Sequence, residues 1–196
     1  MSTTLILLVV AAFVVLWAVS IYNSLVRLKN QVKNAWSQID VQLQRRYDLI
    51  PNLIEAVKGY MSYEKGTLEA VVQARSEAVS AKDKLARAGG PAEASLKELL
   101  AAEVTLKGAL GQIFALAENY PNLKASENMK MLQEELSSTE NKVAFARQAY
   151  NDQTMAYNTY QQEFPNVIFA GIFGHHPSDL WIVQDDKAKT APKVAF

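Results

Sequence analysis

Hydrophobic side chains fill the start of the chain, where residues 5–19 are apolar without interruption and residues 1–26 carry no charge. A helix of about 20 apolar residues crosses a bilayer, and residues 3–22 supply that length with Ser20 as a polar interruption. We therefore predict a transmembrane anchor over residues 1–22. The side chains expected to contact lipid are Leu5, Ile6, Leu7, Leu8, Val9, Val10, Phe13, Val14, Val15, Leu16, Trp17 and Val19.

A cleaved secretory signal is the alternative interpretation of this segment, because Ala18 and Ser20 are small residues at a position suited to cleavage. A signal peptide ordinarily begins with basic residues, and residues 1–4 contain no Lys or Arg. We therefore favour an anchor that stays attached.

Basic side chains follow the apolar segment at Arg27, Lys29 and Lys33. Positive charges beside a span tend to stay in the cytoplasm, which predicts an external N-terminus and a cytoplasmic body. Such charges also attract anionic lipid headgroups, by about 1 kcal/mol each close to the surface. We expect these three residues to contact headgroups.

Beyond the anchor, prolines divide the chain into stretches with helical periodicity, and we predict helices at about 23–48, 50–83, 92–119 and 126–164. The first should end near Asp48, because Pro51 disfavours helical geometry at the residue before it. Its apolar residues recur every three or four positions and continue directly from the anchor: Leu25, Leu28, Val32, Trp36, Ile39 and Leu43.

The last long helix has the strongest periodic signal, a heptad seam that runs from Met129 to Phe164. At 1.5 Å per residue, such a helix is roughly 55 to 60 Å long. The fold class expected is all-α, with a transmembrane helix continuing into an elongated antiparallel four-helix bundle. Within the seam we interpret Tyr150, Tyr157 and Tyr160 as core residues rather than as a ligand-binding strip.

After Pro165 the pattern changes to a short apolar segment, residues 166–174, followed by an extended C-terminal tail, residues 175–196. The apolar segment is too short to span a bilayer. Packing on the bundle, contact with another subunit and insertion at the membrane interface are the alternatives, and the lack of Lys and Arg favours the first two. In the tail we expect Trp181, Ile182 and Val183 to be buried.

Composition excludes several classes of chemistry. The net charge is zero, which argues against a nucleic-acid partner. There is no cysteine, and therefore no disulfide, thiolate metal site or cysteine nucleophile. The conceivable metal ligands are His175, His176, Asp179 and Asp185, but their spacing is not that of a metal site. We expect no cofactor, no bound metal and no enzymatic activity.

Candidate interaction surfaces remain. Arg45, Arg46 and Asp48 form a polar corner next to Pro51, where the arginines would hold a carboxylate or phosphate, or else cap helix ends and form ion pairs. A second candidate surface contains Ile168, Phe169 and Phe173. Glu103 lies among the apolar positions of the third helix. A buried functional carboxylate is one interpretation, and we favour the other, a position at the edge of a broad stripe that Leu100 and Val104 complete.

Several blocks of the sequence resemble the LemA family of bacterial membrane proteins. The most specific is residues 34–53, which read NAWSQIDVQLQRRYDLIPNL. Further agreement lies in YPNLKA at 120–125, TENKVAFAR at 139–147 and PKVAF at 192–196. The resemblance covers nearly the whole chain and implies an N-terminal anchor, a long antiparallel helical bundle, a bacterial inner-membrane location and no established enzymatic activity. His175 follows Gly174 where the family has an aromatic residue.

Two functional hypotheses from different classes follow. In the first, the protein is a scaffold that binds membrane lipids and assembles into homo-oligomers through apolar helix faces. In the second, it is an adaptor or sensor that presents its bundle to another membrane protein, such as an envelope protease or a signalling protein. A hydrolase that uses the loop of His175 and His176 is a third, weaker hypothesis.

Overall fold

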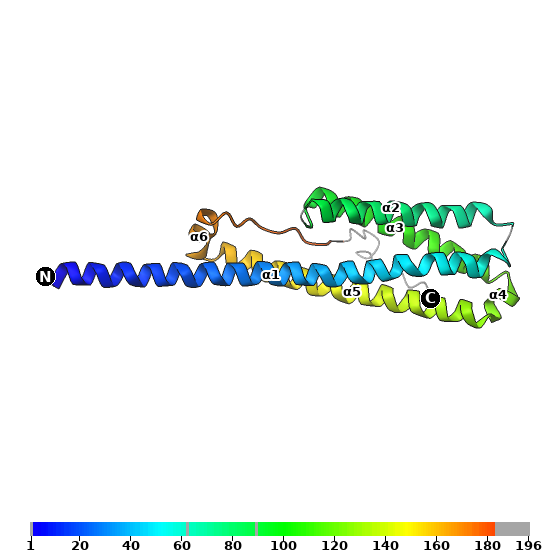
Figure 1. Ribbon diagram of the computed structural model, residues 1–196, viewed down its shortest axis with the longest axis horizontal. Coiled ribbons are helices and arrows are strands. Elements are labelled where there is room, and N and C mark those ends of the chain that lie inside the picture. Colours follow the sequence, from blue (N-terminus) through cyan, green and yellow to red (C-terminus); the bar gives the residue numbers. More distant parts are fainter. Residues whose placement is uncertain (1, 62, 89, 183–196) are drawn as a thin grey trace, which may run out of the picture.

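Six helices make up the computed structural model, which describes residues 2–61, 63–88 and 90–182. Within those residues there is no strand. The all-helical, antiparallel fold expected from the sequence is confirmed (Figure 1). The helices are α1 (Ser2–Lys58), α2 (Lys65–Arg87), α3 (Glu93–Ala117), α4 (Pro121–Ala125), α5 (Glu127–Gln162) and α6 (Asn166–Ile172).

Helix α1 is a continuous rod of 57 residues, and its N-terminal part projects beyond the other helices (Figure 1). Burial begins at Ile21 and recurs every three to four residues, as the apolar stripe predicted. The fully buried residues include Leu25, Ile39 and Leu43. One helix therefore joins the projecting apolar segment to the core of the bundle.

The predicted helix end near Asp48 is wrong, because α1 runs through Pro51 to Lys58. Proline lacks an N–H, so it leaves the carbonyl four residues earlier, that of Tyr47, without its usual helical donor. Arg75 of α2 provides the replacement: its Nε donates to the Tyr47 carbonyl oxygen at 2.7 Å. A tertiary hydrogen bond thus compensates for the local defect of the proline.

Helix α2 consequently begins at Lys65, not at residue 50, and ends at Arg87. Met61 lies in the connection between α1 and α2 and is completely buried. The turn after α2 was expected, and Gly90 adopts φ +133°, a conformation open to glycine alone among the common residues. Helix α3 differs little from its predicted bounds.

The heptad seam of α5 forms much of the core, as predicted. Tyr150 and Tyr157 are completely buried, which confirms the interpretation of these tyrosines as core, and Tyr160 is partly buried. Phe164, the last position of the seam, is 82% exposed because α5 ends at Gln162.

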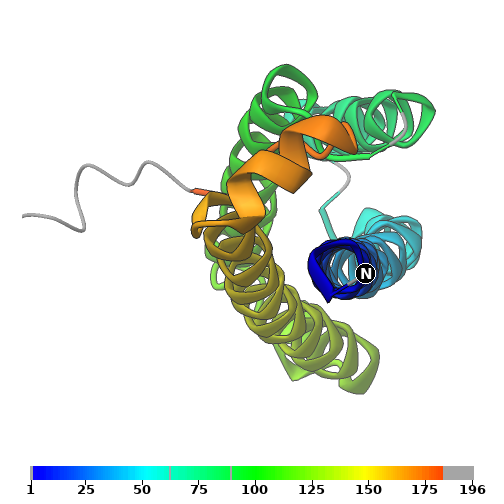
Figure 2. The ribbon, with the colours of Figure 1, turned by 90° about the vertical axis from the view of Figure 1, so that its left-hand side faces the viewer.

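The helices pack as two pairs, α1 with α5 and α2 with α3, around a core that runs along the bundle. The end-on view shows α1, α5 and the α2–α3 pair arranged around that axis (Figure 2). In the same view, α6 lies across the near end of the bundle, the end from which α1 projects.

Candidate functional site

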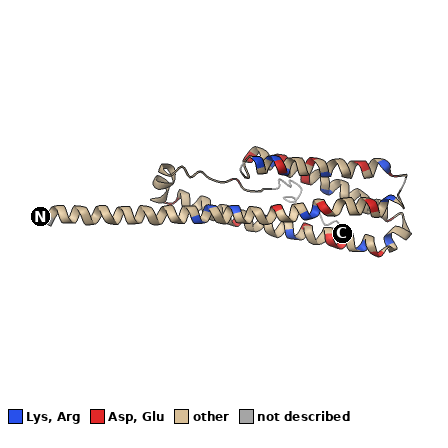
Figure 3. Ribbon diagram, in the orientation of Figure 1, with Lys and Arg blue, Asp and Glu red and all other residues tan. Residues whose placement is uncertain are grey.

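The projecting part of α1 is the first candidate for function. Its apolar side chains are 46–69% exposed, and almost none of this segment is buried by the rest of the chain. Figure 3 shows that the projecting stretch carries no charge. Helix α3 is also long and apolar enough to cross a membrane, but its inward face, with Leu99 and Leu106, belongs to the bundle core. Exposure therefore singles out α1.

The predicted headgroup contacts lie where α1 enters the bundle. Arg27, Lys29 and Lys33 are all exposed and form the first charges after the apolar segment (Figure 3). The structure thus leaves these three side chains accessible for ionic contacts.

Helix α6 packs beside α1 at the level of Tyr22. The rings of Tyr22 and Phe173 meet edge to face, with centroids 5.0 Å apart. Phe169 is partly buried against the core, whereas Ile168 is 53% exposed. The predicted preference for packing is confirmed for one face of this segment, and its other face remains open.

Residues 175–182, here called the strap, run back along α5 in extended form. Asn158 pairs with the backbone of Ser178 twice: its Nδ2 donates to the carbonyl at 2.8 Å and its Oδ1 accepts from the N–H at 2.9 Å. One heptad earlier, Asn151 pairs with Trp181 in the same way, at 3.0 Å and 2.8 Å. Two asparagines on one face of α5 therefore hold an extended peptide by its backbone.

Aromatic contacts complete the attachment of the strap. Trp181 is buried, and its ring lies 5.5 Å from that of Trp36, measured between centroids. Tyr150 donates to the Asp179 carbonyl at 2.7 Å, and burial raises the pKa of Tyr150 to about 12, which keeps its hydroxyl protonated. Ile182 is 60% exposed, so its predicted burial is wrong, while Val183 lies outside the described residues.

His175, the first residue of the strap, contacts α5. Its Nδ1 lies 2.9 Å from the Tyr157 hydroxyl oxygen. Burial lowers the pKa of the His175 ring, and the positive charge of Lys29 lowers it further. The ring is therefore held in its neutral form, in which Nδ1 can accept the tyrosine hydrogen bond.

A buried polar cluster lies between α1 and α3, and it corrects the expected position of Glu103. Glu103 is 9% exposed rather than at the edge of its stripe, because Arg46 pairs with it: Arg46 Nη1 lies 2.6 Å from Glu103 Oε2. Tyr47 donates to the other carboxylate oxygen at 2.5 Å. Burial, followed by the negative charge of Glu103, raises the pKa of Tyr47 and keeps it a donor. The position of Glu103 between Leu99 and Leu106 in the seam was the sequence signal for its burial.

The predicted polar corner does not exist as one surface, because its residues lie inside α1 and point in different directions. Arg46 is buried. Arg45 instead pairs with Glu135 of α5 at 2.8 Å, and Asp48 accepts from Gln44 at 2.9 Å. The alternative assignment as ion pairs is confirmed for both arginines, and capping is excluded since α1 continues to Lys58.

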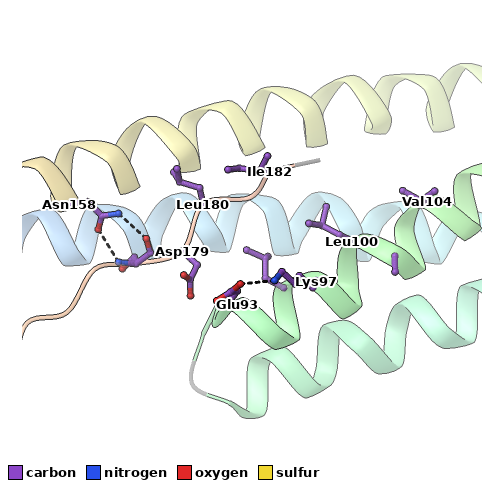
Figure 4. Close-up of a pocket in the computed structure, with 11 residues that line it drawn as sticks. Glu93, Lys97, Leu100, Val104, Asn158, Asp179, Leu180 and Ile182 are labelled. Carbon is purple, nitrogen blue, oxygen red and sulfur yellow. Dashed lines mark hydrogen bonds and ion pairs between the residues drawn. The ribbon is translucent and has the colours of Figure 1, made fainter. Parts of the chain in front are cut away.

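A groove of about 830 Å³ lies between the start of α3 and the strap (Figure 4). Leu100, Val104 and Ile182 contribute apolar walls. Its charged rim contains Glu93 and Lys97, which pair with each other at 2.6 Å. The groove therefore combines apolar walls with a rim on which Glu93 and Lys97 are already paired with each other.

The histidines of the strap do not assemble a metal centre within residues 2–61, 63–88 and 90–182, where no group of three or more metal-ligating side chains occurs. His175 is committed to Tyr157. Asp185, the remaining predicted ligand, lies outside the described residues.

Comparison with known proteins places these features in context. The model of the LemA family matches residues 35–196. The chain is 26% identical to magnetosome protein MamQ 2 of Paramagnetospirillum magneticum over 187 residues, 88% of this chain and 68% of that protein. It is 26% identical to magnetosome protein MamQ of Magnetospirillum gryphiswaldense, over 78% of this chain and 61% of the relative. The chain is 29% identical to protein LemA of Metamycoplasma hominis, over 70% of this chain and 58% of that relative.

Proposed function

Since the chain belongs to the LemA family, we propose that it is a membrane-anchored, non-catalytic helical scaffold that associates with further copies of itself at the surface of the bacterial inner membrane. The observation that carries this proposal is the continuity of α1, a single helix from the exposed apolar segment to the bundle core. A rigid connection holds every copy at the same depth and in the same orientation in the bilayer. Matching side faces of neighbouring copies therefore meet in one plane, at a high effective concentration.

The outward face of α5 supplies apolar contact area for such association. Phe145 and Met155 both belong to the long helix α5, and they are 73% and 59% exposed. Copies that place these residues against one another would remove them from water.

The basic residues after the anchor support a cytoplasmic bundle with an external N-terminus. Arg27, Lys29 and Lys33 follow the apolar segment, while residues 1–4 carry no Lys or Arg. Because the chain contains no cysteine, a single cysteine introduced at Met131 tests this orientation. A membrane-impermeant thiol reagent should label that cysteine only when it is added on the cytoplasmic side.

Light scattering on the full-length protein in mild detergent, with the detergent mass subtracted, tests self-association. We expect a discrete or very large homo-oligomer. Replacing Phe145 and Met155 together by Gln should weaken assembly by at least about tenfold, which corresponds to about 1.4 kcal/mol. The matched control replaces both by Leu, keeps the apolar surface and should assemble normally.

A clean monomer of the unaltered protein would overturn self-driven scaffolding. The adaptor function would then be favoured, and cross-linking in the native membrane would be the way to find its membrane-protein partner. Equal assembly of the Gln and Leu variants would leave the scaffold intact and move the contact away from this face of α5.

A further inference from the structure

Helix α6 occupies a special position in the bundle. It lies across the end from which α1 projects, transverse to α1 in both views (Figures 1 and 2). Phe173, the residue that directly follows α6, contacts Tyr22 of α1, with ring centroids 5.0 Å apart. A helix transverse to a membrane-spanning rod lies parallel to the membrane surface.

The two faces of α6 differ in their contacts. Asn166 and Ala170 are buried, and Asn166 Nδ2 donates to the Tyr160 carbonyl at 3.0 Å, which fixes the inward face. The opposite face holds Val167, Ile168 and Ile172, which are 48%, 53% and 70% exposed. No charged residue occurs from Phe164 to Gly174. The exposed face is therefore entirely uncharged.

The level of α6 along α1 matches the boundary of a bilayer. Residues 3–22 form a helix about 30 Å long at 1.5 Å per residue, which is the thickness of the hydrocarbon core. Tyr22 then stands at the membrane–water boundary, where amphipathic aromatic rings are favoured. Because Phe173 contacts Tyr22, α6 lies at that same boundary.

We propose that the exposed face of α6 inserts into the bilayer at the boundary between headgroups and acyl chains, in the leaflet where α1 leaves the membrane. This inference rests on the membrane anchoring of the proposed function but not on self-association. An independent interfacial helix needs basic residues to reach the surface. Helix α6 does not, since α1 already holds it there, and the first charges of α1, Arg27 and Lys29, lie just beyond Tyr22. The bundle is thereby attached to the membrane at two points.

Single-cysteine variants of the cysteine-free chain test this directly. An environment-sensitive fluorophore is placed at Ile168→Cys and at Gly171→Cys in the full-length protein, reconstituted at one copy per lipid nanodisc. A Cβ added at Gly171 meets no atom within 4 Å, so the second variant removes no packed side chain. Met131→Cys, at a 56% exposed position of α5 far from α6, is the control.

The expected result is blue-shifted emission at positions 168 and 171, protection from aqueous iodide, and quenching by lipids that carry a nitroxide just below the headgroup. The control should show the opposite pattern. Fluorophores on α6 that iodide quenches as strongly as the control would overturn the inference. Protection that requires several copies per disc would also overturn it and assign α6 to a contact between copies. Failure of the chain to enter nanodiscs would overturn the anchor itself, an outcome distinct from the other two.

Discussion

Arg46 of α1 and Glu103 of α3 form an ion pair in the interior of the bundle, with Nη1 and Oε2 2.6 Å apart and both side chains at least 90% buried. Neither charge has free access to water, so each depends on the other for its stabilisation. Tyr47 occupies the second carboxylate oxygen of Glu103. This cluster ties α1 to α3, two helices that belong to different pairs of the bundle.

Replacing Glu103 by Ala should destabilise the protein by about 3 to 5 kcal/mol, because the charge of Arg46 would stay buried without a partner. Thermal unfolding of the full-length protein in mild detergent, followed by circular dichroism, measures the loss. Glu93→Ala breaks a carboxylate–cation pair whose side chains are 70% exposed, and should shift the unfolding transition far less, because water already solvates both charges.

The double replacement Arg46→Met with Glu103→Leu should recover much of that stability, because two apolar side chains leave no unpaired charge. A double variant as unstable as Glu103→Ala alone would contradict this prediction. It would show that the cluster stabilises the fold by more than the mutual neutralisation of Arg46 and Glu103.

Arg75→Ala should destabilise the protein by about 1 to 3 kcal/mol, because the Tyr47 carbonyl loses a charged donor. In a Pro51→Ala background the same change should cost less, since the amide N–H introduced at position 51 can donate to that carbonyl along the helix. A double-mutant cycle on unfolding free energies measures this coupling. Identical costs in the two backgrounds would refute the compensation.

Asn158→Ala should loosen the strap, because the Ser178 N–H loses its acceptor, Asn158 Oδ1, and the Ser178 carbonyl loses its donor, Asn158 Nδ2. The opening free energy of residues 176–181, measured by amide hydrogen exchange, should fall by about 1 to 3 kcal/mol. Asn158→Asp keeps the acceptor for the Ser178 N–H and should lose less. Asn141→Ala, at an exposed position of the same helix, is the control and should leave exchange in the strap unchanged.

Acidification should also weaken the strap through His175. Its pKa in the folded protein is lowered below the ordinary 6.5, so the unfolded chain binds the proton more readily than the folded one. The contribution of the neutral ring is complete above the ordinary pKa and is lost as the pH falls from there through the lowered pKa of the folded protein. Amide exchange of the strap, corrected for intrinsic exchange rates, should show this trend, and His175→Asn should abolish it.

The heptad seam of α5 shows how far sequence reasoning reaches into the core. Leu136, Tyr150 and Tyr157 are buried where the periodicity placed them, because a side chain's position on a helix follows from its sequence number. The apolar segment at the N-terminus is recognisable for a similar reason, since its length and lack of charge are local properties.

Periodicity and local propensity did not predict the interactions between helices. The passage of α1 through Pro51 depends on Arg75, which is 28 residues from its acceptor Tyr47. Burial of Glu103 depends on Arg46, which is 57 residues away. Local propensity predicted that α1 ends before Pro51 and that the Glu103 carboxylate is exposed. In the structure, Arg75 stabilises the continued helix and Arg46 stabilises the buried carboxylate.

By itself, the sequence therefore determined the helical class, the apolar N-terminal helix, the seam of the core and the family, all of which depend on patterns within a segment or on the order of residues. Tertiary structure alone decided which buried charges are paired, where the strap lies on α5, and that α6 crosses the bundle beside Tyr22. The physical reason is that hydrogen bonds, ion pairs and ring contacts form between atoms that the fold brings together, whatever their separation along the chain.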